Sequence, residues 1–224
     1  MIKIFLDSSD ISAIREYKDK VQGFTTNPTL MRKAGVTDYE KFCKEVLAEV
    51  GNKPVSFEVF ADDFDEMERQ AKLISSWGDN VYVKIPITNT KGEYSTGLIK
   101  KLYDLKLNIT AITELDQVEN LKPVINSNSI ISVFAGRIAD TGRDPIEYVS
   151  KSKKMIGDLA QILWASPREA LNIYQAEAAG ADIITCTPEL ITKYEKFKDM
   201  DLDELSLETV KMFYNDGKEA GYKL

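Results

Sequence analysis

One strand–helix–strand unit occupies residues 81–112, which read VYVKIPITNTKGEYSTGLIKKLYDLKLNITAI. The unit begins with a short apolar run, Val81–Ile85, and ends with another, Asn108–Ile112. Between these runs, leucines from Leu98 to Leu105 recur every three or four residues, which is the spacing of one helix face. Two apolar strands joined by an amphipathic helix are typical of a parallel sheet, because the helix returns the chain to the start of the next strand.

The same alternation of apolar runs and helical stretches continues along the whole chain. One helix is predicted at residues 39–50, with a capping box formed by Thr37 and Glu40. Three later helices are predicted to begin at a proline, whose missing N–H is harmless in a first turn. Those three are Pro145–Met155, Pro167–Ala179 and Pro188–Phe197. The other six predicted strands are Ile2–Asp7, Gly23–Thr26, Val55–Phe60, Ile130–Ala135, Gln161–Ala165 and Asp182–Cys186.

Eight strand–helix units of this length predict a closed (β/α)8 TIM barrel formed by residues 1–200. An open, doubly wound sheet is the alternative, but no G-x-G-x-x-G follows the first strand and no G-x-x-x-x-G-K-[ST] occurs. Residues 201–224 are expected to form a helical extension of the same domain. This helix would pack on the barrel's own helices or on a neighbouring subunit. Its apolar residues are Leu205, Leu207, Val210, Phe213 and Tyr214.

The composition disfavours several classes of function. The 224 residues carry a net charge of −7, whereas a nucleic-acid-binding protein needs a basic face. The absence of histidine excludes Ser-His-Asp and Cys-His catalysis and His-ligated zinc. Cys43 and Cys186 are too few for a structural zinc site and are expected to be reduced in a cytoplasmic protein. The opening MIKIFLD is unlike a signal peptide, and no stretch approaches the ~18 apolar residues of a membrane helix.

Lys84 is the central candidate for chemistry, because it lies between Val83 and Ile85 inside an apolar strand. Burying an ammonium costs free energy, so this lysine must pair with a carboxylate, reach solvent at the strand end or give up its proton. A neutral amine in an apolar site is a nucleophile that forms a Schiff base with a carbonyl substrate. An apolar wall with nearby cationic groups would favour that neutral form. The structural and the nucleophilic interpretations both stay open at this point.

Other polar side chains lie near the ends of neighbouring predicted strands, where parallel barrels place their active sites. Asp7 ends the first strand and Glu58 lies in the third, so the two carboxylates could move protons, with Thr110 holding a water between them. Asn108 lies two residues before Thr110, so the two share a face of the strand. Capping of a helix is the alternative role for each carboxylate.

A second polar group follows the sixth and seventh strands. Ser132 and Phe134 share a face of the sixth strand, and Arg137 follows them. Ser166-Pro-Arg168 is predicted to open a helix, so a hydroxyl, backbone N–H groups and a guanidinium could bind one phosphate there. Barrels often bind phosphate near the seventh and eighth strands. A surface salt bridge is the alternative for each arginine.

At these residues the chain resembles the transaldolase family, over nearly its whole length. The length fits the short subfamily, which includes the transaldolase-like proteins and the fructose-6-phosphate aldolases. The five matching blocks, in order, are Gly23-Phe-Thr-Thr-Asn-Pro-Thr29, Val83-Lys-Ile-Pro86, Leu107-Asn-Ile-Thr110, Ser132-Val-Phe-Ala-Gly-Arg137 with Asp140, and Ala165-Ser-Pro-Arg168.

The resemblance implies a role for each of these positions. Lys84 would form a Schiff base with a ketose, while Glu58, Thr110 and Asp7 would position the catalytic water and move protons. No metal or organic cofactor is implied. The implied substrate-binding residues are Thr26, Asn27, Asn108, Ser132, Phe134, Arg137, Ser166 and Arg168, the last three at the phosphate.

The resemblance also bears on the type of reaction and on partners. Hydrolytic aldolases of the family place Gln and Tyr where this chain has Glu58 and Phe134, so the resemblance favours a transaldolase of the pentose phosphate pathway. Its sugar-phosphate donor would be sedoheptulose 7-phosphate or fructose 6-phosphate. The alternatives are a fructose-6-phosphate aldolase, a sugar-phosphate-binding barrel without catalysis, and a scaffold protein. The resemblance further implies a homodecamer or homopentamer. The negative net charge and the lack of a long apolar stretch predict no nucleic-acid or membrane partner.

Overall fold

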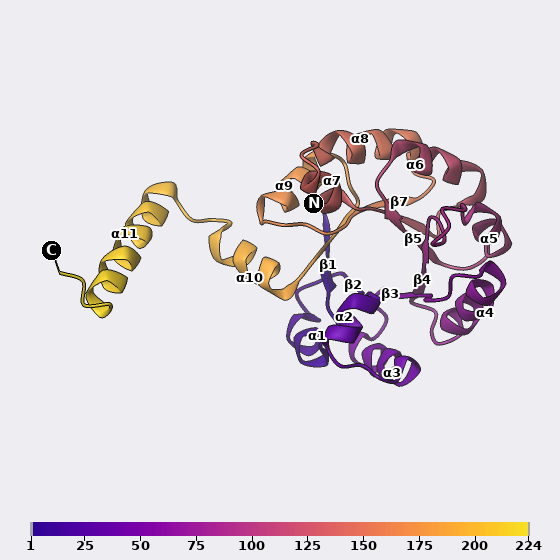
Figure 1. The fold of residues 1–224 in the computed structure, drawn as a ribbon, viewed down its shortest axis with the longest axis horizontal. Coiled ribbons are helices and arrows are strands. Elements are labelled where there is room, and N and C mark those ends of the chain that lie inside the picture. Colours follow the sequence, from indigo (N-terminus) through magenta and orange to yellow (C-terminus); the bar gives the residue numbers. More distant parts are fainter. Residues whose placement is uncertain (1, 224) are drawn as a thin grey trace. The chain divides into compact units, whose positions relative to one another are not determined.

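The computed structural model describes residues 2–223, which divide into one unit up to Leu190 and another from Ile191 onward. In the first unit the strands close into a parallel barrel in sequence order (Figure 1), and β8 pairs with β1. The predicted (β/α)8 barrel is therefore confirmed, and the open sheet is excluded. The strands are β1 (Lys3–Asp7), β2 (Gly23–Thr25), β3 (Val55–Glu58), β4 (Val81–Pro86), β5 (Leu107–Ile112), β6 (Ser129–Val133), β7 (Gln161–Trp164) and β8 (Ile183–Cys186).

In the first unit, helices α1 to α9 alternate with the strands and surround the barrel (Figure 1). Their buried faces pack against the outer side chains of the strands, as the helical periodicity predicts. The helices are α1 (Ile11–Tyr17), α2 (Pro28–Lys33), α3 (Tyr39–Val50), α4 (Phe64–Ser75), α5 (Thr96–Lys101), α6 (Leu115–Leu121), the 3-10 helix η1 (Lys122–Val124), α7 (Ala135–Asp140), α8 (Pro145–Ile156), α9 (Leu171–Ala178), α10 (Pro188–Phe197) and α11 (Leu202–Glu219).

Two of the predicted helix starts are wrong. α3 is capped by Asp38, whose Oδ1 accepts the N–H of Lys41 at 3.0 Å, so the predicted Thr37–Glu40 capping box does not form. α9 begins at Leu171 rather than at Pro167. The physical reason is that the side chain of Asn172 bonds the amides that an earlier helix start would have left free, as described below.

The interior of the barrel is apolar at one level and polar at the next. Phe5, Ile130, Leu163 and Ile183 form a buried apolar floor. Gly23, opposite Phe5 in the sheet, leaves room for its ring, because a Cβ there would lie 2.4 Å from it. Two residues further along each strand, side chains again point inward. That next level holds the polar residues Asp7, Thr25, Lys84, Ser132 and Thr185.

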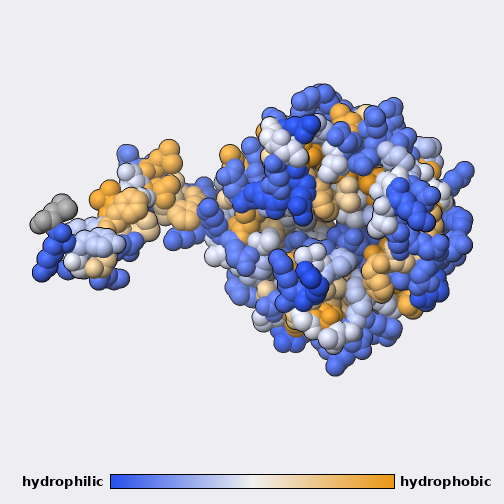
Figure 2. Space-filling view, in the orientation of Figure 1, coloured by the Kyte–Doolittle hydropathy of each residue, from blue (hydrophilic) through white to orange (hydrophobic). Residues whose placement is uncertain are grey.

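The second unit contains the predicted C-terminal helix, which is confirmed as α11. Asp201 caps it, with its Oδ1 accepting the N–H of Asp203 at 2.8 Å. Apolar side chains gather on this unit in Figure 2, and Leu202 and Phe213 are 78% and 64% exposed. Across residues 2–223, no helix combines the length and apolarity needed to cross a bilayer.

Candidate active site

A cavity of about 450 Å³ lies at the carboxyl ends of the strands, where the polar level of the barrel meets the following loops. This volume falls within the range of small-molecule sites. All the predicted site residues line it except Thr26 and Arg168. Those that do are Asp7, Asn27, Glu58, Lys84, Asn108, Thr110, Ser132, Phe134, Arg137 and Ser166.

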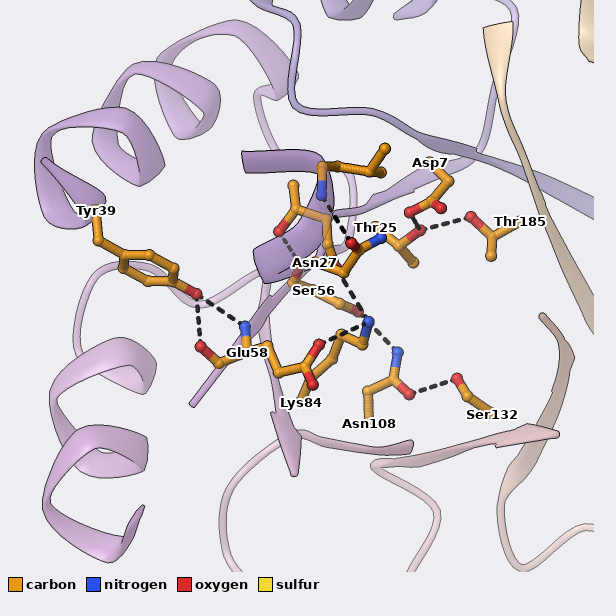
Figure 3. Close-up of polar contacts among 12 residues, drawn as sticks. Asp7, Thr25, Asn27, Tyr39, Ser56, Glu58, Lys84, Asn108, Ser132 and Thr185 are labelled. Atoms are coloured by element: carbon orange, nitrogen blue, oxygen red, sulfur yellow. Dashed lines mark hydrogen bonds and ion pairs between the residues drawn. The ribbon is translucent and has the colours of Figure 1, made fainter. Parts of the chain in front are cut away.

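Lys84 and Glu58 form an ion pair in this cavity (Figure 3). Lys84 Nζ lies 3.1 Å from Glu58 Oε2, and their side chains are 8% and 18% exposed. The register of β3 with β4 places the two residues opposite one another, so the sheet itself creates the pair. Pairing with a carboxylate is one of the interpretations that the sequence left open for Lys84, and it is the contact that the structure shows.

Thr26 does not line the cavity, but its backbone contacts Lys84. Its carbonyl accepts a hydrogen bond from Lys84 Nζ at 3.0 Å, and its own hydroxyl donates to the carbonyl of Ser56 at 3.1 Å. The contribution of Thr26 in this structure is therefore to orient the amine through its backbone. Asn27 caps α2, where its Oδ1 accepts the N–H of Leu30 at 2.9 Å, and its side chain still lines the cavity.

Asp7 is held by a chain of two hydroxyls (Figure 3). Thr25 Oγ1 donates to Asp7 Oδ1 at 2.7 Å and lies 2.6 Å from Thr185 Oγ1. Because the one hydroxyl proton of Thr25 is directed at Asp7, Thr185 is the donor of the second bond. Enclosure by the barrel raises the pKa of Asp7, although the charge of Lys84 and the bond from Thr25 act in the opposite direction.

A second network crosses the polar level from β6 to β3. Ser132 Oγ donates to Asn108 Oδ1 at 2.6 Å, and Asn108 Nδ2 donates to Ser56 Oγ at 3.0 Å. Asn108 lies opposite Lys84 in the register of β4 with β5. These two bonds fix the orientation of the Asn108 side-chain amide, which lines the cavity near the Lys84 amine.

Thr110 follows on β5 at a local irregularity. The register with β6 shifts between Ile109 and Ile112, and Ala111 has a φ of 64°, a conformation that is unusual for a residue with a Cβ. Thr110 Oγ1 is buried and has no hydrogen-bond partner among residues 2–223. Because Thr110 also lines the cavity, its hydroxyl is available to a molecule bound there.

The predicted phosphate group is only partly assembled. Arg137 and Ser166 line the cavity, but Arg168 does not. The guanidinium of Arg168 is 47% exposed and pairs with both carboxylate oxygens of Asp140, at 3.2 and 2.6 Å. This is the salt bridge that the sequence left open as the alternative for Arg168.

The loop at Ser166 takes a strained path instead of the predicted helix start. Ser166 has a φ of 58°, and Asn172 Oδ1 accepts the backbone N–H groups of Arg168 and Glu169 at 2.7 and 3.1 Å. These amides are therefore engaged within the protein. The expectation that a helix start at Pro167 offers free N–H groups to a phosphate is wrong.

The structure adds residues that sequence reasoning missed. Thr25, Ser56 and Thr185 carry the two hydrogen-bond networks. The two-residue period of the strands could have pointed to Ser56, which precedes Glu58 by two positions. Tyr39 bonds the backbone of Glu58 from a helix, and its place in an amphipathic helix gave no such signal.

The donor set fits carbonyl chemistry. A buried amine beside a carboxylate, with hydroxyls and a second carboxylate within one cavity, supplies a nucleophile and groups that can move protons. In the part of the chain that the structure describes, no cluster of three or more Asp, Glu or Cys side chains could hold a metal ion.

Comparison with known proteins gives concordant results. The sequence model of the family "Transaldolase/Fructose-6-phosphate aldolase" matches residues 4–224. A probable transaldolase of Streptococcus equi subsp. zooepidemicus (strain MGCS10565) is 35% identical over 197 residues, 86% of this chain and 89% of the relative. A probable transaldolase of Thermoplasma volcanium is 34% identical over 191 residues, 82% of this chain and 83% of the relative.

Solved structures show the same fold at low sequence identity. Orotidine 5'-monophosphate decarboxylase from Metallosphaera sedula superposes with a TM-score of 0.58 and 14% identity, covering 88% of this chain and 99% of that protein. A mandelate oxidase mutant gives the same TM-score at 13% identity, covering 84% of this chain and 64% of that one. At such identities the likeness concerns the barrel architecture alone.

Proposed function

The chain belongs to the transaldolase/fructose-6-phosphate aldolase family, and on that premise we propose that it is a transaldolase. It would transfer a dihydroxyacetone unit from sedoheptulose 7-phosphate or fructose 6-phosphate to an aldose phosphate. The observation that carries the proposal is the Lys84–Glu58 pair, buried at 3.1 Å in a cavity lined by hydroxyls, an amide and an arginine.

The first step would be attack of Lys84 on the ketone carbon of the donor. The ammonium must first give up a proton, and the carboxylate of Glu58 is in contact to accept it. The new N–C bond gives a carbinolamine, in which the former carbonyl oxygen has become a hydroxyl. Glu58 would return a proton to that hydroxyl, which leaves as water, and the nitrogen lone pair forms the iminium. The free hydroxyl of Thr110 would hold this water.

Cleavage would follow at the bond between C3 and C4 of the donor. Asp7 would accept the proton of the C4 hydroxyl, whose oxygen becomes the carbonyl of the departing aldose phosphate. The electron pair of the broken bond moves toward the iminium and leaves an enamine on Lys84. Addition of the enamine carbon to an acceptor aldehyde reverses these steps. The raised pKa of Asp7 supports this role, because a carboxylate whose pKa is raised by burial is a stronger base than an ordinary one.

Phe134, which lines the cavity, supports transfer of the three-carbon unit to an acceptor rather than its release as free dihydroxyacetone. Its side chain has no hydroxyl that could help to protonate the enamine, so the three-carbon unit would wait for an acceptor. A fructose-6-phosphate aldolase, which frees dihydroxyacetone and glyceraldehyde 3-phosphate, is the alternative within the family.

The phosphate of the substrate would bind at Arg137 and Ser166, which line the cavity. Arg168 would join them after leaving its pair with Asp140. Since an exposed salt bridge contributes only about 0–1 kcal/mol, a phosphate dianion can compete for this guanidinium.

Trapping of the Schiff base tests the proposal directly. The protein is incubated with fructose 6-phosphate and sodium borohydride, digested and analysed by mass spectrometry. A dihydroxyacetone-sized adduct is expected on Lys84 in the wild type, and no adduct in Lys84→Met. The matched control is Lys106→Met, which removes a lysine remote from the cavity and should trap normally. Binding of the sugar without any adduct would favour a barrel that binds sugar phosphates without catalysis. Failure to bind the sugar at all would favour a scaffold protein.

A coupled assay separates the two candidate reactions. Release of glyceraldehyde 3-phosphate from fructose 6-phosphate is followed with and without erythrose 4-phosphate. A transaldolase needs the acceptor for turnover. Equal rates in the two assays would favour the aldolase.

A further inference from the structure

The end of β3 lacks a strand partner on one side. In a parallel sheet, the backbone groups of alternate residues point to the same neighbouring strand. Phe24 and Thr26 donate from the β2 side to the carbonyls of Pro54 and Ser56, at 2.8 and 3.2 Å. Glu58 is the next residue on that side, but β2 ends at Thr25 and the chain turns into α2. The N–H and C=O of Glu58 therefore need another partner.

Tyr39 supplies both missing partners with one hydroxyl (Figure 3). The phenol donates to the carbonyl of Glu58 at 2.6 Å and accepts its N–H at 3.0 Å. On the opposite side, Val59 donates to the carbonyl of Lys84 at 3.1 Å and ties the same segment to β4. The peptide units around Glu58 are thus held from both sides, by Tyr39 and by the strand that carries Lys84.

The phenol itself is firmly placed. Tyr39 is the first residue of α3, directly after the Asp38 cap. Its ring packs against Phe60 and Trp77, with centroids 5.2 and 6.2 Å away. Burial raises the pKa of Tyr39, so the hydroxyl keeps the proton that it needs to act as donor and acceptor at once.

We propose that Tyr39 is a positioning residue for the Schiff-base reaction, which sets the carboxylate of Glu58 against the amine of Lys84 by bonding the backbone of Glu58. The inference rests on the proposed function. Tyr39 does not line the cavity, so it acts through Glu58 and not on the substrate. Displacement of a catalytic group by about 1 Å can lower a rate about 100-fold, so a backbone contact at this point bears on catalysis.

The first test is Tyr39→Phe, which keeps the ring contacts and removes only the hydroxyl. The expected result is a kcat about tenfold lower, with KM for fructose 6-phosphate within about twofold of the wild type, because substrate contacts are untouched. The matched control is Tyr17→Phe. It removes a phenol that donates to the carbonyl of Pro188 at 3.2 Å, outside the cavity. Thermal midpoints of both variants show how much each hydroxyl contributes to stability.

The second test is a double-mutant cycle with Glu58→Gln, read as the rate of borohydride trapping on Lys84. If Tyr39 acts through Glu58, the Tyr39→Phe change should have little further effect once the carboxylate is gone.

Three results would overturn the inference. They are an unchanged kcat in Tyr39→Phe, a loss no larger than that of Tyr17→Phe, and a loss that persists in full beside Glu58→Gln. Failure of the wild type to trap any adduct would instead overturn the proposed function, so the two failures are distinguishable.

Discussion

The buried carboxylate of Asp7 lowers the stability of the fold that holds it at neutral pH. Its pKa is raised above the ordinary value of 3.8, mainly because the barrel removes the carboxylate from water. The folded protein therefore binds this proton more tightly than the unfolded chain does. Any stability gained from the bound proton is present below about pH 4 and is lost as the pH rises through the folded-state pKa.

Asp7→Asn should therefore stabilise the protein at neutral pH while nearly abolishing activity. The amide oxygen can still accept the bond from Thr25, so local packing is kept. We expect a higher urea midpoint than the wild type at pH 7, a difference that shrinks toward pH 4, and a kcat lower by about 100-fold or more. A stability difference that stays constant or grows toward pH 4 would show that folding does not raise the pKa of Asp7, and would contradict this prediction.

Phe134 offers a residue-level test of reaction type. Phe134→Tyr places a hydroxyl on the cavity wall, where it can assist protonation of the enamine. Glyceraldehyde 3-phosphate release without an acceptor is expected to rise about tenfold relative to the wild type. The control is Phe60→Tyr, which adds the same hydroxyl to a ring outside the cavity, exposed to solvent. If Phe134→Tyr still needed an acceptor for turnover as much as the wild type does, the missing hydroxyl would not explain why the three-carbon unit is transferred rather than released.

At the level of single elements, the sequence predicts the strands well and their ends less well. Apolar runs place every strand to within two residues, because burial of a parallel strand leaves a continuous local signal. The ends at the cavity depend on contacts between distant residues. β3 ends at Glu58, two residues before the predicted Phe60, where the hydroxyl of Tyr39 replaces a strand partner. No local pattern carries that information.

In the candidate site, too, the positions of residues on strands could be predicted from the sequence, whereas the position of one loop residue could not. The two-residue period and the strand ends brought Lys84, Glu58 and Asp7 together correctly, because all of them lie on strands that share one barrel mouth. Arg168 lies in a loop, where its partner Asp140 and the path of the backbone decide its position. Period and capping rules do not describe such loops, so the pairing of Arg168 with Asp140 away from the cavity lining could not be predicted.

The contact between Gly136 and the Ser166 loop gives a prediction at the scale of elements. A Cβ at position 136 would lie 1.6 Å from the carbonyl oxygen of Ser166, so only glycine lets α7 approach this loop. Gly136→Ala should cost about 1–3 kcal/mol of unfolding free energy, displace Ser166 and raise KM for the sugar phosphate. Urea unfolding and steady-state kinetics measure the two effects.

The matched control for this variant is Gly97→Ala in α5, where an added methyl meets nothing within 4 Å. Removing a helix glycine there should stabilise the protein by about 0.5–1 kcal/mol and leave KM unchanged. If Gly136→Ala behaved like this control, the loop would be free to move away and the close approach would have no role.

At the scale of the whole molecule, the apolar residues that stabilise the barrel unit and the polar residues of the candidate site occupy different levels. The apolar floor at Phe5, Leu163 and Ile183 and the helix-facing layer hold the strands in place, while the polar residues occupy the level nearest the strand ends. A buried ion pair is costly to desolvate and is weak evidence of stability. Its place in the polar level of the barrel, beside the cavity, therefore supports the proposed reaction.

The second unit provides the last prediction, which concerns assembly. Monomeric proteins rarely expose a large contiguous apolar face, yet on α11 Val210 and Phe213 are both exposed, at positions that share one side of the helix. We propose that this side packs on a neighbouring subunit in a homopentamer or homodecamer. Analytical ultracentrifugation should show the wild type as an oligomer and the double variant Val210→Glu, Phe213→Glu as a smaller species. Lys211→Glu, on the same helix, changes charge without removing apolar surface and should leave the assembly intact. A monomeric wild type at micromolar concentration would contradict the proposal.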